Sequence, residues 1–369
     1  MNILYVTTIS LTMNSFFKPH IQMLVDEGVR VEIACNDKDL PLDRLYEKLG
    51  CKVHRVAFSR SPLSPGNIRA YRQLKKVIES GNYDIVHCHT PNASVVTRLA
   101  CRKFRKRDGL KVFYTAHGFH FYKGAPILNW MIYYPVEKFC SRFTDKLITI
   151  NQEDHTLAKK KFQAKKVCYA PGIGIDLSRF QRVQPDTAAK RREIGVLEDA
   201  FLLLSVGELN KNKNHQLTIR ALAELHAPTI HYAIAGTGDQ KEQLLKLAES
   251  LGVSEQVHLL GYRTDVEQIY KAADAFCLPS YREGLSVSLM EAMGSGLPVV
   301  CSRIRGNVDL ICENGGVLFD PHSVSACRKA IEMVIAADRK KMGENNRKKM
   351  VSFSITNVIK VMRKIYEIS

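Results

Sequence analysis

Residues 275–300 read AFCLPSYREGLSVSLMEAMGSGLPVV: an apolar run, a loop that contains glycine, a helical stretch and a second apolar run. Strand, loop, helix and strand in this order are typical of a parallel β-α-β unit. Glu283 and Glu291 stand eight positions apart around the start of the helical stretch. A helix N-terminus normally attracts anions, so the two carboxylates there require a different ligand.

The same alternation extends outward through the chain in two series of strand-like runs, and helical patterns follow from residue 323 to the C-terminus, the last over 354–367. Between the series, residues 183–195 are polar and lack a strand pattern, so we place a linker near residues 172–198. A chain of 369 residues has room for two domains. The expected strands are residues 2–8, 30–35, 84–89, 111–117 and 146–151, and then 201–207, 231–236, 257–261, 275–280, 298–302 and 316–320.

This pattern predicts an α/β fold with two Rossmann-like domains that face each other across a cleft. The active site is expected in that cleft, at the carboxyl ends of the strands. The composition, 45% hydrophobic and 25% charged, is that of a globular protein. The ten cysteines form no CxxC pair, which favours reduced, buried thiols of a cytosolic protein.

The N-terminal residues MNILYVTTIS lack the features of a signal peptide. The longest apolar candidate, residues 125–135, is about half of the ~20 residues that a membrane-spanning helix needs. We therefore expect a cytoplasmic protein, with peripheral contact at the inner face of the cytoplasmic membrane as a further expectation.

The net charge of +17 is unevenly distributed. Residues 51–150 hold 18 Lys and Arg against 5 Asp and Glu, a net of +13, whereas residues 201–300 hold 8 against 11, a net of −3. The densest patch, residues 102–111, would attract a polyanion such as phospholipid headgroups, a lipid diphosphate or nucleic acid, and a solvated helix face is the alternative. The aromatic run at 119–135 would lie among lipid headgroups or pack as core. Nucleic-acid-binding signatures are absent from the sequence, so no nucleic-acid partner is expected.

Several polar residues follow expected strands. His117 comes directly after one, where a side chain tends to face the cleft, although backbone groups of its own loop could equally satisfy it. His87 and His89 share one face of a strand end, but further metal ligands at a recognised spacing do not follow, so no metal site is expected. Asp37 and Asp39 form a DxD that could hold a cation on a diphosphate, or simply a turn.

In the second series, the segment SVGELNKNKNH (205–215) delivers Lys211 and Lys213 to a strand end. A lysine there could neutralise a phosphate leaving group, and a solvated loop is the alternative. Gly236 and Gly238 in IAGTGDQ permit close approach of a ligand or simply a tight turn. Neither a GxGxxG fingerprint nor a Walker A lysine motif occurs in the sequence.

The Glu283-x7-Glu291 element resembles the signature of retaining family-4 glycosyltransferases, which have the GT-B double-Rossmann fold. Other stretches resemble the same family in the same order, so that the resemblance covers essentially the full chain. The first domain is most similar to bacterial members that assemble capsule, exopolysaccharide or lipid-linked oligosaccharides. The stretches are TAHG (115–118), PGIGID (171–176), VGELNKNKN (206–214), IAGTGDQKEQL (234–244) and LGYRTDVEQIYKAADAFCLPS (260–280).

The resemblance implies a role for each matching residue. Glu291 would bind the ribose hydroxyls of the nucleotide, and Glu283 would contact the donor sugar. Lys213 would neutralise the departing diphosphate, and His117 would stand beside the donor sugar and the acceptor. The backbone of Gly284, Leu285 and Ser286 would hold the sugar and diphosphate. The Tyr262–Arg263 segment would contact the base. Gly207, Glu208 and Gly236 would be further donor-binding residues. Acceptor-binding residues would be Thr12, Asn14, His89, Phe119 and His120.

Two departures from the family pattern stand out. The family usually has arginine where this chain has Glu208, and Lys211, Arg303 or Arg305 could supply the missing cation. The usual Gly-Gly pair after the first strand is replaced by LTMNSF (11–16), whose residues Thr12, Met13, Asn14 and Ser15 would form a different acceptor-side loop.

The resemblance implies an acceptor-binding domain at 1–172, a donor-binding domain at 173–350 and a C-terminal helix at 351–369 that returns to the first domain. The implied function is retaining transfer of a hexose or N-acetylhexosamine from a nucleotide sugar, with UDP expected, to a polyprenyl-diphosphate-linked or other glycan acceptor in bacterial surface polysaccharide synthesis. No cofactor and no metal are expected. A nucleotide-sugar epimerase or a phosphorylase remains the alternative, because fold alone does not settle function.

Overall fold

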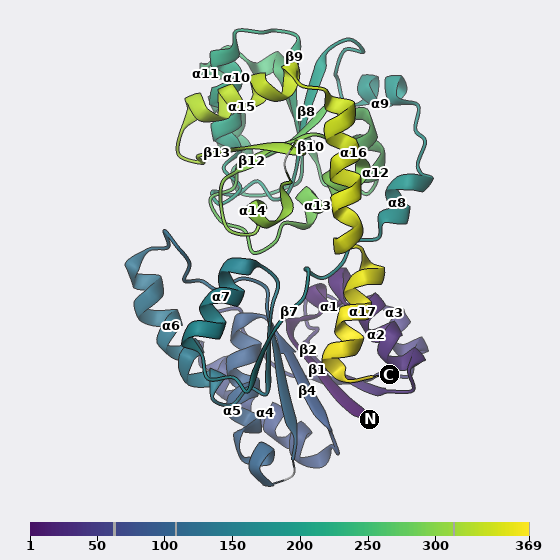
Figure 1. Ribbon diagram of the computed structural model, residues 1–369, viewed down its shortest axis with the longest axis vertical. Coiled ribbons are helices and arrows are strands. Elements are labelled where there is room, and N and C mark those ends of the chain that lie inside the picture. Colours follow the sequence, from purple (N-terminus) through teal and green to yellow (C-terminus); the bar gives the residue numbers. More distant parts are fainter. Residues whose placement is uncertain (62–63, 108, 313, 369) are drawn as a thin grey trace. The chain divides into compact units, whose positions relative to one another are not determined.

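The chain forms two units, each built around a parallel β-sheet (Figure 1). The computed structural model describes residues 1–61, 64–107, 109–312 and 314–368. The first unit comprises Met1–Ile173 and the C-terminal residues from Val358, and the second comprises Gly174–Asn357. The expected α/β class and the return of the C-terminal helix to the first unit are confirmed. Within the described part of the chain, no helix has the length and apolar character needed to span a membrane.

The seven strands of the first unit are arranged in the order β3-β2-β1-β4-β5-β6-β7. The order along the sheet reverses between β1 and β4, so the loops that follow these two strands lie at a topological switch point, where open α/β sheets bind their ligands. The strands are β1 (Asn2–Ile9), β2 (Arg30–Asn36), β3 (Lys52–Arg55), β4 (Ile85–His89), β5 (Lys111–Ala116), β6 (Lys146–Thr149) and β7 (Lys166–Tyr169).

Helices cover both faces of this sheet because alternate strand residues point to opposite sides. Leu4 and Val6 of β1 pack with one group of helices, and Ile3 and Tyr5 pack with the other. The first group is α4 (Gly66–Ser80), α5 (Pro91–Arg107), α6 (Ile127–Ser141) and α7 (Gln152–Lys161), and the second is α1 (Ser10–Phe16), α2 (Lys18–Asp26), α3 (Arg44–Lys48) and α17 (Ile355–Tyr366) (Figure 1).

The C-terminal helix α17 is held to the first unit by an apolar stripe and a charge. Its buried residues are Val358, Met362, Ile365 and Tyr366. They recur at helical spacing and join the core formed by Ile3, Tyr5 and Ile21. Arg363 forms an ion pair with Glu27 at the end of α2.

The six strands of the second unit follow the order β10-β9-β8-β11-β12-β13. The switch point of this sheet therefore lies between β8 and β11, and the loops after these strands meet there. The strands are β8 (Phe201–Val206), β9 (Ile230–Ala235), β10 (Val257–Gly261), β11 (Ala275–Leu278), β12 (Val299–Ser302) and β13 (Gly316–Phe319).

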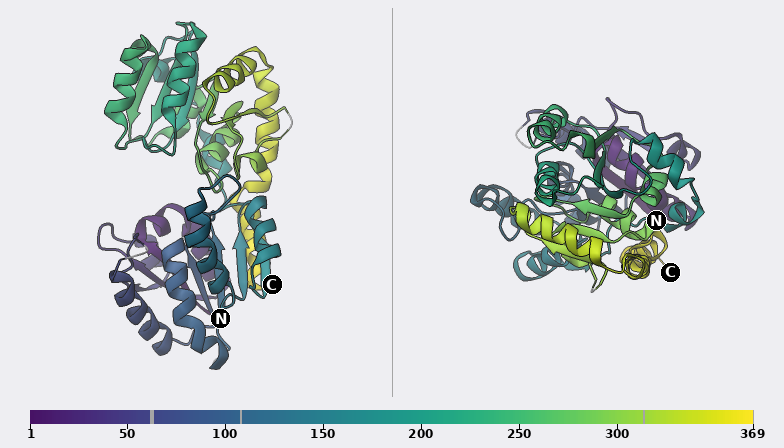
Figure 2. Two further views of the ribbon diagram at one scale, coloured as in Figure 1. Left: turned by 90° about the vertical axis from the view of Figure 1, so that its left-hand side faces the viewer. Right: turned by 90° about the horizontal axis from the view of Figure 1, so that it is seen from above.

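Helices lie on both faces of this sheet as well, as the views in Figure 2 show. Leu203 and Val300 belong to the core shared with the first of two helix groups, whereas Phe276 contacts Tyr270 of the second. The first group is α10 (His215–Leu225), α11 (Lys241–Ser250), α15 (Val324–Ala336) and α16 (Arg339–Met350), and the second includes α12 (Val266–Ala272) and α13 (Val287–Ser295). The short elements are α14 (Asn307–Leu310) and the 3-10 helices η1 (Ser254–Gln256) and η2 (Val351–Phe353).

The chain passes from the first unit to the second at Ile173–Gly174, within the expected linker at 172–198, but most of that segment is not a linker. This segment forms α8 (Leu177–Arg182) and α9 (Thr187–Glu193), which pack on α13 and α12 of the second unit. Each helix begins at an aspartate whose carboxylate accepts a hydrogen bond from the backbone two or three residues later, Asp176 for α8 and Asp186 for α9. Two polar edge strands, β3 and β7, were not expected.

Candidate active site

The loops after β8 and β11 meet at the switch point of the second unit and are tied together through Asn212. Its side-chain amide donates to the carbonyl of Arg282 at 2.9 Å, and the N–H of Tyr281 donates to the Asn212 carbonyl at 2.9 Å. These bonds hold Lys213 next to Glu283, with the ammonium Nζ 2.7 Å from the carboxylate Oε1. The two side chains are 19% and 14% exposed, so the structure brings these expected catalytic residues into one partly buried ion pair.

Helix α13 begins directly after this pair. Ser286 caps the helix, because its hydroxyl accepts from the N–H of Leu289 at 3.3 Å. Gly306, in the loop after β12, has φ +80°, and a Cβ there would lie 2.2 Å from the Gly284 carbonyl oxygen. The glycine therefore lets two loops approach closely beside the N-terminal amides of α13, where an anion would bind.

One of the three cations considered in place of the missing arginine contacts the loop before α13. Arg305 is buried, and its Nε donates to the Glu283 carbonyl at 3.3 Å. Arg303 and Lys211 are exposed. Glu208 itself is exposed, and its carboxylate accepts from the Asn210 amide at 2.8 Å.

Glu291 lies on α13 and its side chain contacts Tyr270 of α12. The Tyr270 hydroxyl donates to Oε2 of Glu291 at 3.2 Å. Burial raises the pKa of the Glu291 carboxyl, and the nearby Arg179 guanidinium offsets this in part. A carboxylate with little solvent is well suited to accept hydrogen bonds from ligand hydroxyls.

The remaining donor-side residues lie on neighbouring loops of the same unit. A Cβ on Gly236 would lie 1.9 Å from the Gly207 carbonyl oxygen, so the loops after β8 and β9 touch at this glycine. Tyr262, after β10, is 79% exposed and presents a free ring face. The Arg263 side chain pairs with Asp265 at 2.7 Å and with Glu193 at 2.5 Å, so its charge is neutralised within the unit.

In the first unit, His117 and His89 contact each other at the ends of β5 and β4. Nε2 of His117 and Nδ1 of His89 are 3.2 Å apart. Tyr5 and Phe17 pack against the His89 ring, with ring centroids 4.6 and 4.3 Å away. Burial lowers the pKa of His89 well below the ordinary range and that of His117 to about 4, with His20 adding to the effect on His117, so both imidazoles are neutral at pH 7.

Two other candidate metal ligands, His87 and Asp37, are engaged by other side chains, and Asp39 is exposed. Both ring nitrogens of His87 have partners, the Tyr366 hydroxyl at 2.5 Å and the Thr115 hydroxyl at 2.8 Å. Asp37 pairs with Arg55 at 3.0 Å. Over the described residues, no group of three or more His, Cys, Asp or Glu side chains has the geometry of a metal site.

Three expected acceptor residues line cavities of the first unit. Thr12 and His120 line a cavity of about 420 Å³, which we call the head cavity. Phe119 and His120 line a larger cavity of about 790 Å³ between α4, α5 and α6, which we call the tail cavity. Asn14 and His89 line neither cavity. The Asn14 amide is instead bonded on both sides to the loop before α3, at the Pro41 carbonyl and the Asp43 N–H.

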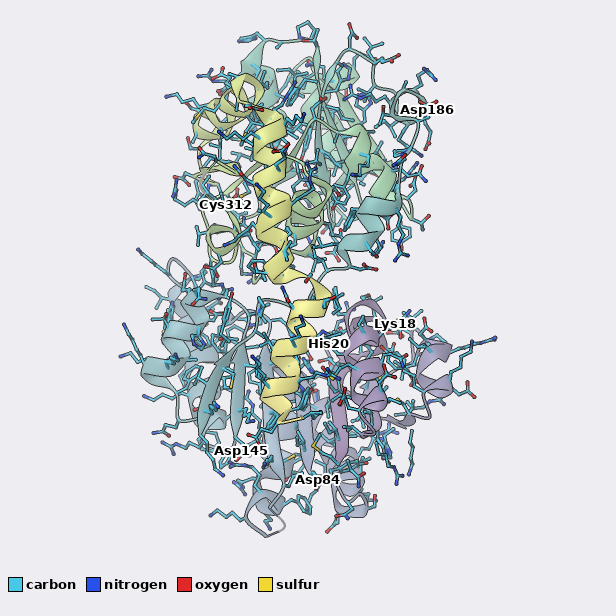
Figure 3. All side chains as sticks on the ribbon, turned by 45° about the vertical axis from the view of Figure 1, so that its right-hand side comes forward. Lys18, His20, Asp84, Asp145, Asp186 and Cys312 are labelled. Atoms are coloured by element: carbon cyan, nitrogen blue, oxygen red, sulfur yellow. The ribbon has the colours of Figure 1, made fainter. Side chains whose placement is uncertain are left out.

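Two residues at the first-unit switch point escaped the sequence analysis. Thr90 has φ +65°, which is rare for a β-branched residue, and its Oγ1 is 2.6 Å from the Thr8 hydroxyl. His20 of α2, labelled in Figure 3, is hydrogen-bonded through Nε2 to the Ile173 carbonyl at 2.8 Å. The unusual φ of Thr90 cannot be recognised from the residues around it in the sequence. His20 could not be singled out because it occupies an ordinary position in the helical pattern KPHIQMLVD.

The chain is similar to proteins that transfer sugars. Residues 186–349 match the family described as glycosyl transferases group 1, and residues 2–151 match the glycosyl transferase 4-like family. The Bacillus subtilis protein EpsD, which is named as a glycosyltransferase, is 38% identical over 99% of this chain and 96% of its own length. This chain belongs to the family-4 GT-B glycosyltransferases. Its activity as a transferase follows from this membership.

Two further proteins are similar to this glycosyltransferase along most of its length. An Escherichia coli enzyme named UDP-Gal:α-D-GlcNAc-diphosphoundecaprenol α-1,3-galactosyltransferase is 28% identical over 81% of this chain and 79% of its own length. The Anabaena protein Alr3699/HepE, solved in complex with UDP, superposes with a TM-score of 0.77 at 19% identity over 100% of both chains. The latter likeness shows the shared GT-B fold.

Proposed function

We propose that this glycosyltransferase moves a hexose or N-acetylhexosamine from a UDP-sugar to a polyprenyl-diphosphate-linked glycan, with retention of the anomeric configuration, in the synthesis of a bacterial surface polysaccharide. The name of the Escherichia coli relative, with a UDP-sugar donor and a lipid-linked acceptor, supports both substrates. Solved structures of the Anabaena protein with UDP and with UDP-glucose support the uridine donor.

The Lys213–Glu283 pair beside the start of α13 is the observation that carries this proposal. The donor diphosphate would accept hydrogen bonds from the amides at Gly284–Ser286. The Lys213 ammonium would stabilise the negative charge that grows on the diphosphate as its bond to the sugar breaks. Glu283 lies within reach of the same ligand, where its carboxylate would accept from a sugar hydroxyl. Glu291, farther along α13, would accept from the ribose.

In the reaction, the bond between the anomeric carbon and the diphosphate oxygen breaks, and the acceptor oxygen forms its bond to that carbon on the same face of the sugar. The acceptor proton moves to the leaving phosphate oxygen, so the products are the glycoside and UDP. Lys213 and the helix amides stabilise the negative charge that develops on the leaving group. These groups supply the positive charge that a metal ion would otherwise supply, so we expect turnover to persist in the presence of a chelator.

Product analysis tests the proposal. The purified protein should transfer sugar from one of a panel of UDP-sugars to an undecaprenyl-diphosphate-linked sugar, and the proton–proton coupling of the new anomeric centre should match that of the donor. Inversion at this centre would overturn the retaining mechanism. Interconversion of UDP-sugars without any acceptor would favour an epimerase, and exclusive turnover of GDP-sugars would overturn the uridine assignment.

A membrane contact through α6 belongs to the same proposal. Ile127, Leu128, Met131 and Ile132 are 51–78% exposed and lie on one face of the helix. Of the aromatic residues in the run, Phe119 and Phe121 are buried in the core, and Trp130, Tyr133 and Tyr134 are partly buried against it. Exposed apolar side chains on a unit that also exposes cations such as Arg102 and Lys103 suit an anionic lipid surface.

Sedimentation with phosphatidylglycerol vesicles tests this contact. Leu128→Ser combined with Met131→Ser should reduce the sedimented fraction, whereas Met333→Ser, an equally exposed residue of the second unit, should not. Equal sedimentation of all three proteins, or no preference for anionic over neutral lipid, would remove the contact.

A further inference from the structure

The head cavity and the tail cavity are adjacent parts of one amphipathic site. They share Pro91, Asn92, His120 and Tyr133 in their walls, so the two cavities border on each other. Both open near the start of α5, at the switch point of the first sheet. The volume of the tail cavity, about 790 Å³, falls within the ~300–1,000 Å³ typical of sites that enclose most of a ligand.

The tail cavity suits a hydrocarbon ligand. Val95, Val96 and Leu99 of α5 face Ile132 and Val136 of α6 across it. Among the described residues that line the tail cavity, Glu137 is the one acidic residue. Its carboxylate is paired with the buried guanidinium of Arg98 at 2.8 Å. The walls therefore offer an apolar ligand a large contact area and no uncompensated charge.

The head cavity has the opposite chemistry. Thr12 supplies a hydroxyl group, whereas the Thr8 and Thr90 hydroxyls are bonded to each other and that of Thr90 donates to the His89 carbonyl. Arg60 supplies a positive charge, for which the described part of the chain offers no acidic partner. Asn92 fixes the position of this arginine, because its side-chain amide donates to the carbonyls of Ser59 and Arg60. An arginine beside a hydroxyl donor matches a phosphate or diphosphate group.

The exposed stripe of α6 extends the apolar wall outward. Ile132 lines the tail cavity and is itself 51% exposed, and Met131, Leu128 and Ile127 continue the apolar surface along the same helix. A chain that is longer than the cavity would thus find an apolar surface at its exit.

We propose that these two cavities bind the lipid end of the acceptor: the tail cavity takes the first isoprene units of a polyprenyl diphosphate, and the head cavity takes its diphosphate at Arg60. This inference rests on the proposed lipid-linked acceptor and assigns that acceptor its binding groups. The protein would thus recognise the isoprenoid anchor directly as well as the sugar that the anchor carries.

Direct binding of a short probe tests the assignment without any turnover. The chain has a single tryptophan, Trp130, whose ring centroid is 5.5 Å from that of Phe121 in the tail-cavity wall. Farnesyl diphosphate should change the Trp130 emission saturably and bind about tenfold more tightly than either inorganic diphosphate or farnesol, because only the complete probe fills both cavities. Equal affinity for the probe and for either fragment would overturn the proposal.

Matched variants locate the site. Val95→Phe fills the tail cavity from α5 and should weaken farnesyl diphosphate binding about tenfold, whereas Val53→Phe on the exposed edge strand β3 should not. Arg60→Gln should abolish the preference for farnesyl diphosphate over farnesol. The control Arg69→Gln, at an exposed position of α4, should retain this preference. Leu99→Phe, one turn from Val95, repeats the first test if Val95→Phe fails to fold.

The outcomes separate this inference from the proposed function. Unchanged probe binding in both cavity-filling variants, or equally tight binding of lysophosphatidylglycerol, would overturn the isoprenoid assignment even if sugar transfer proceeds. Normal probe binding in a protein that transfers no sugar would support the site and overturn the proposed function instead.

Discussion

Glu291 illustrates, at the scale of single residues, how burial prepares a carboxylate for a ligand. The side chain has little solvent around it, one hydroxyl donor from Tyr270 and a raised pKa. In the folded state without ligand this arrangement disfavours the charged form, so its benefit lies in ligand binding rather than in stability.

Replacement of Glu291 by glutamine should therefore separate the two effects. Glu291→Gln should weaken UDP binding by roughly 10- to 100-fold, which corresponds to the loss of a hydrogen bond to a charged group. The thermal midpoint should stay the same or rise, because a buried charge is removed. Calorimetric titration with UDP and with 2′,3′-dideoxy-UDP provides the measurement: the dideoxy compound should bind both proteins equally. A fall in stability together with equal loss of both ligands would assign Glu291 a structural role.

Sequence reasoning reached the residues of the second unit better than those of the first. Lys213, Glu283 and Glu291 belong to long motifs at strand and helix ends, and the structure brings Lys213 and Glu283 into contact. Their contribution to catalysis stays a prediction. In the first unit, Arg60 was not expected to bind a ligand, because a single exposed arginine in a loop has no local pattern and acquires meaning only from the cavity beside it.

At the scale of elements, the donor side is built from loops that approach one another through glycine. Gly306 has φ +80° and touches the Gly284 carbonyl, whereas Gly252 has φ +70° and open space around its Cα. Both glycines have a left-handed backbone conformation. A Cβ added at Gly306 would displace a neighbouring loop, whereas a Cβ added at Gly252 would not.

This difference makes a matched pair of variants. Gly306→Ala and Gly252→Ala should each cost about 1–2 kcal/mol of the free energy of unfolding, because an alanine is strained at positive φ. Gly306→Ala should cost more and should also weaken UDP-sugar binding, because the new Cβ pushes the loop that precedes α13. Thermal melts with and without UDP-sugar measure both effects. If the two variants lose ligand stabilisation equally, the close approach at Gly284 does not matter for binding.

Elements with a strong apolar pattern were predicted well, and polar ones were not. The buried strands β1, β4, β8 and β11 lie where continuous apolar runs indicated them. The edge strands β3 and β7 each begin with a lysine, and few of their residues are buried. Their sequences therefore resemble those of loops. Helices α8 and α9 were missed because they are short and polar, and packing on α13 and α12 stabilises them.

At the scale of the whole molecule, the first unit contains three buried histidines, His20, His87 and His89, and a half-buried fourth, His117. Burial lowers the pKa of each one, and the other histidines nearby add to the effect for all but His20. In the unfolded chain these side chains would titrate near their ordinary value of ~6.5. As the pH falls below that value, the unfolded state therefore binds more protons than the folded state.

Acid should consequently destabilise the first unit well before its carboxylates are protonated. The free energy of unfolding should fall by up to about 1.4 kcal/mol per pH unit for each such histidine as the pH drops from ~6.5 towards the lowered values. Urea unfolding followed by Trp130 emission at pH 7.5, 6.5 and 5.5 reports on this unit. His89→Phe, which suits the packing of Tyr5 and Phe17, should make the pH dependence shallower by about one proton, and the exposed control His226→Asn should leave it unchanged. An identical slope in all three proteins would refute the histidine account.

The two-unit organisation and the family could be inferred from the sequence because each rests on features repeated along the whole chain. The amphipathic site could not, because its walls come from α4, α5 and α6 and the loop at Arg60, which are distant in sequence and meet only after folding. Periodicity identifies the side of a helix that is apolar, but it does not say whether that side is filled by core or left open as a cavity.

The turnover of Lys213→Ala tests the central claim most directly. This variant loses the ammonium 2.7 Å from Glu283, and kcat with the UDP-sugar donor should fall by about 100- to 1,000-fold, as expected when a group that stabilises developing charge is removed. The exposed control Lys246→Ala should keep its activity, and circular dichroism should show the same fold for both. Near-normal turnover of Lys213→Ala would contradict the assignment of this lysine, and with it the active site described at the β8–β11 switch point.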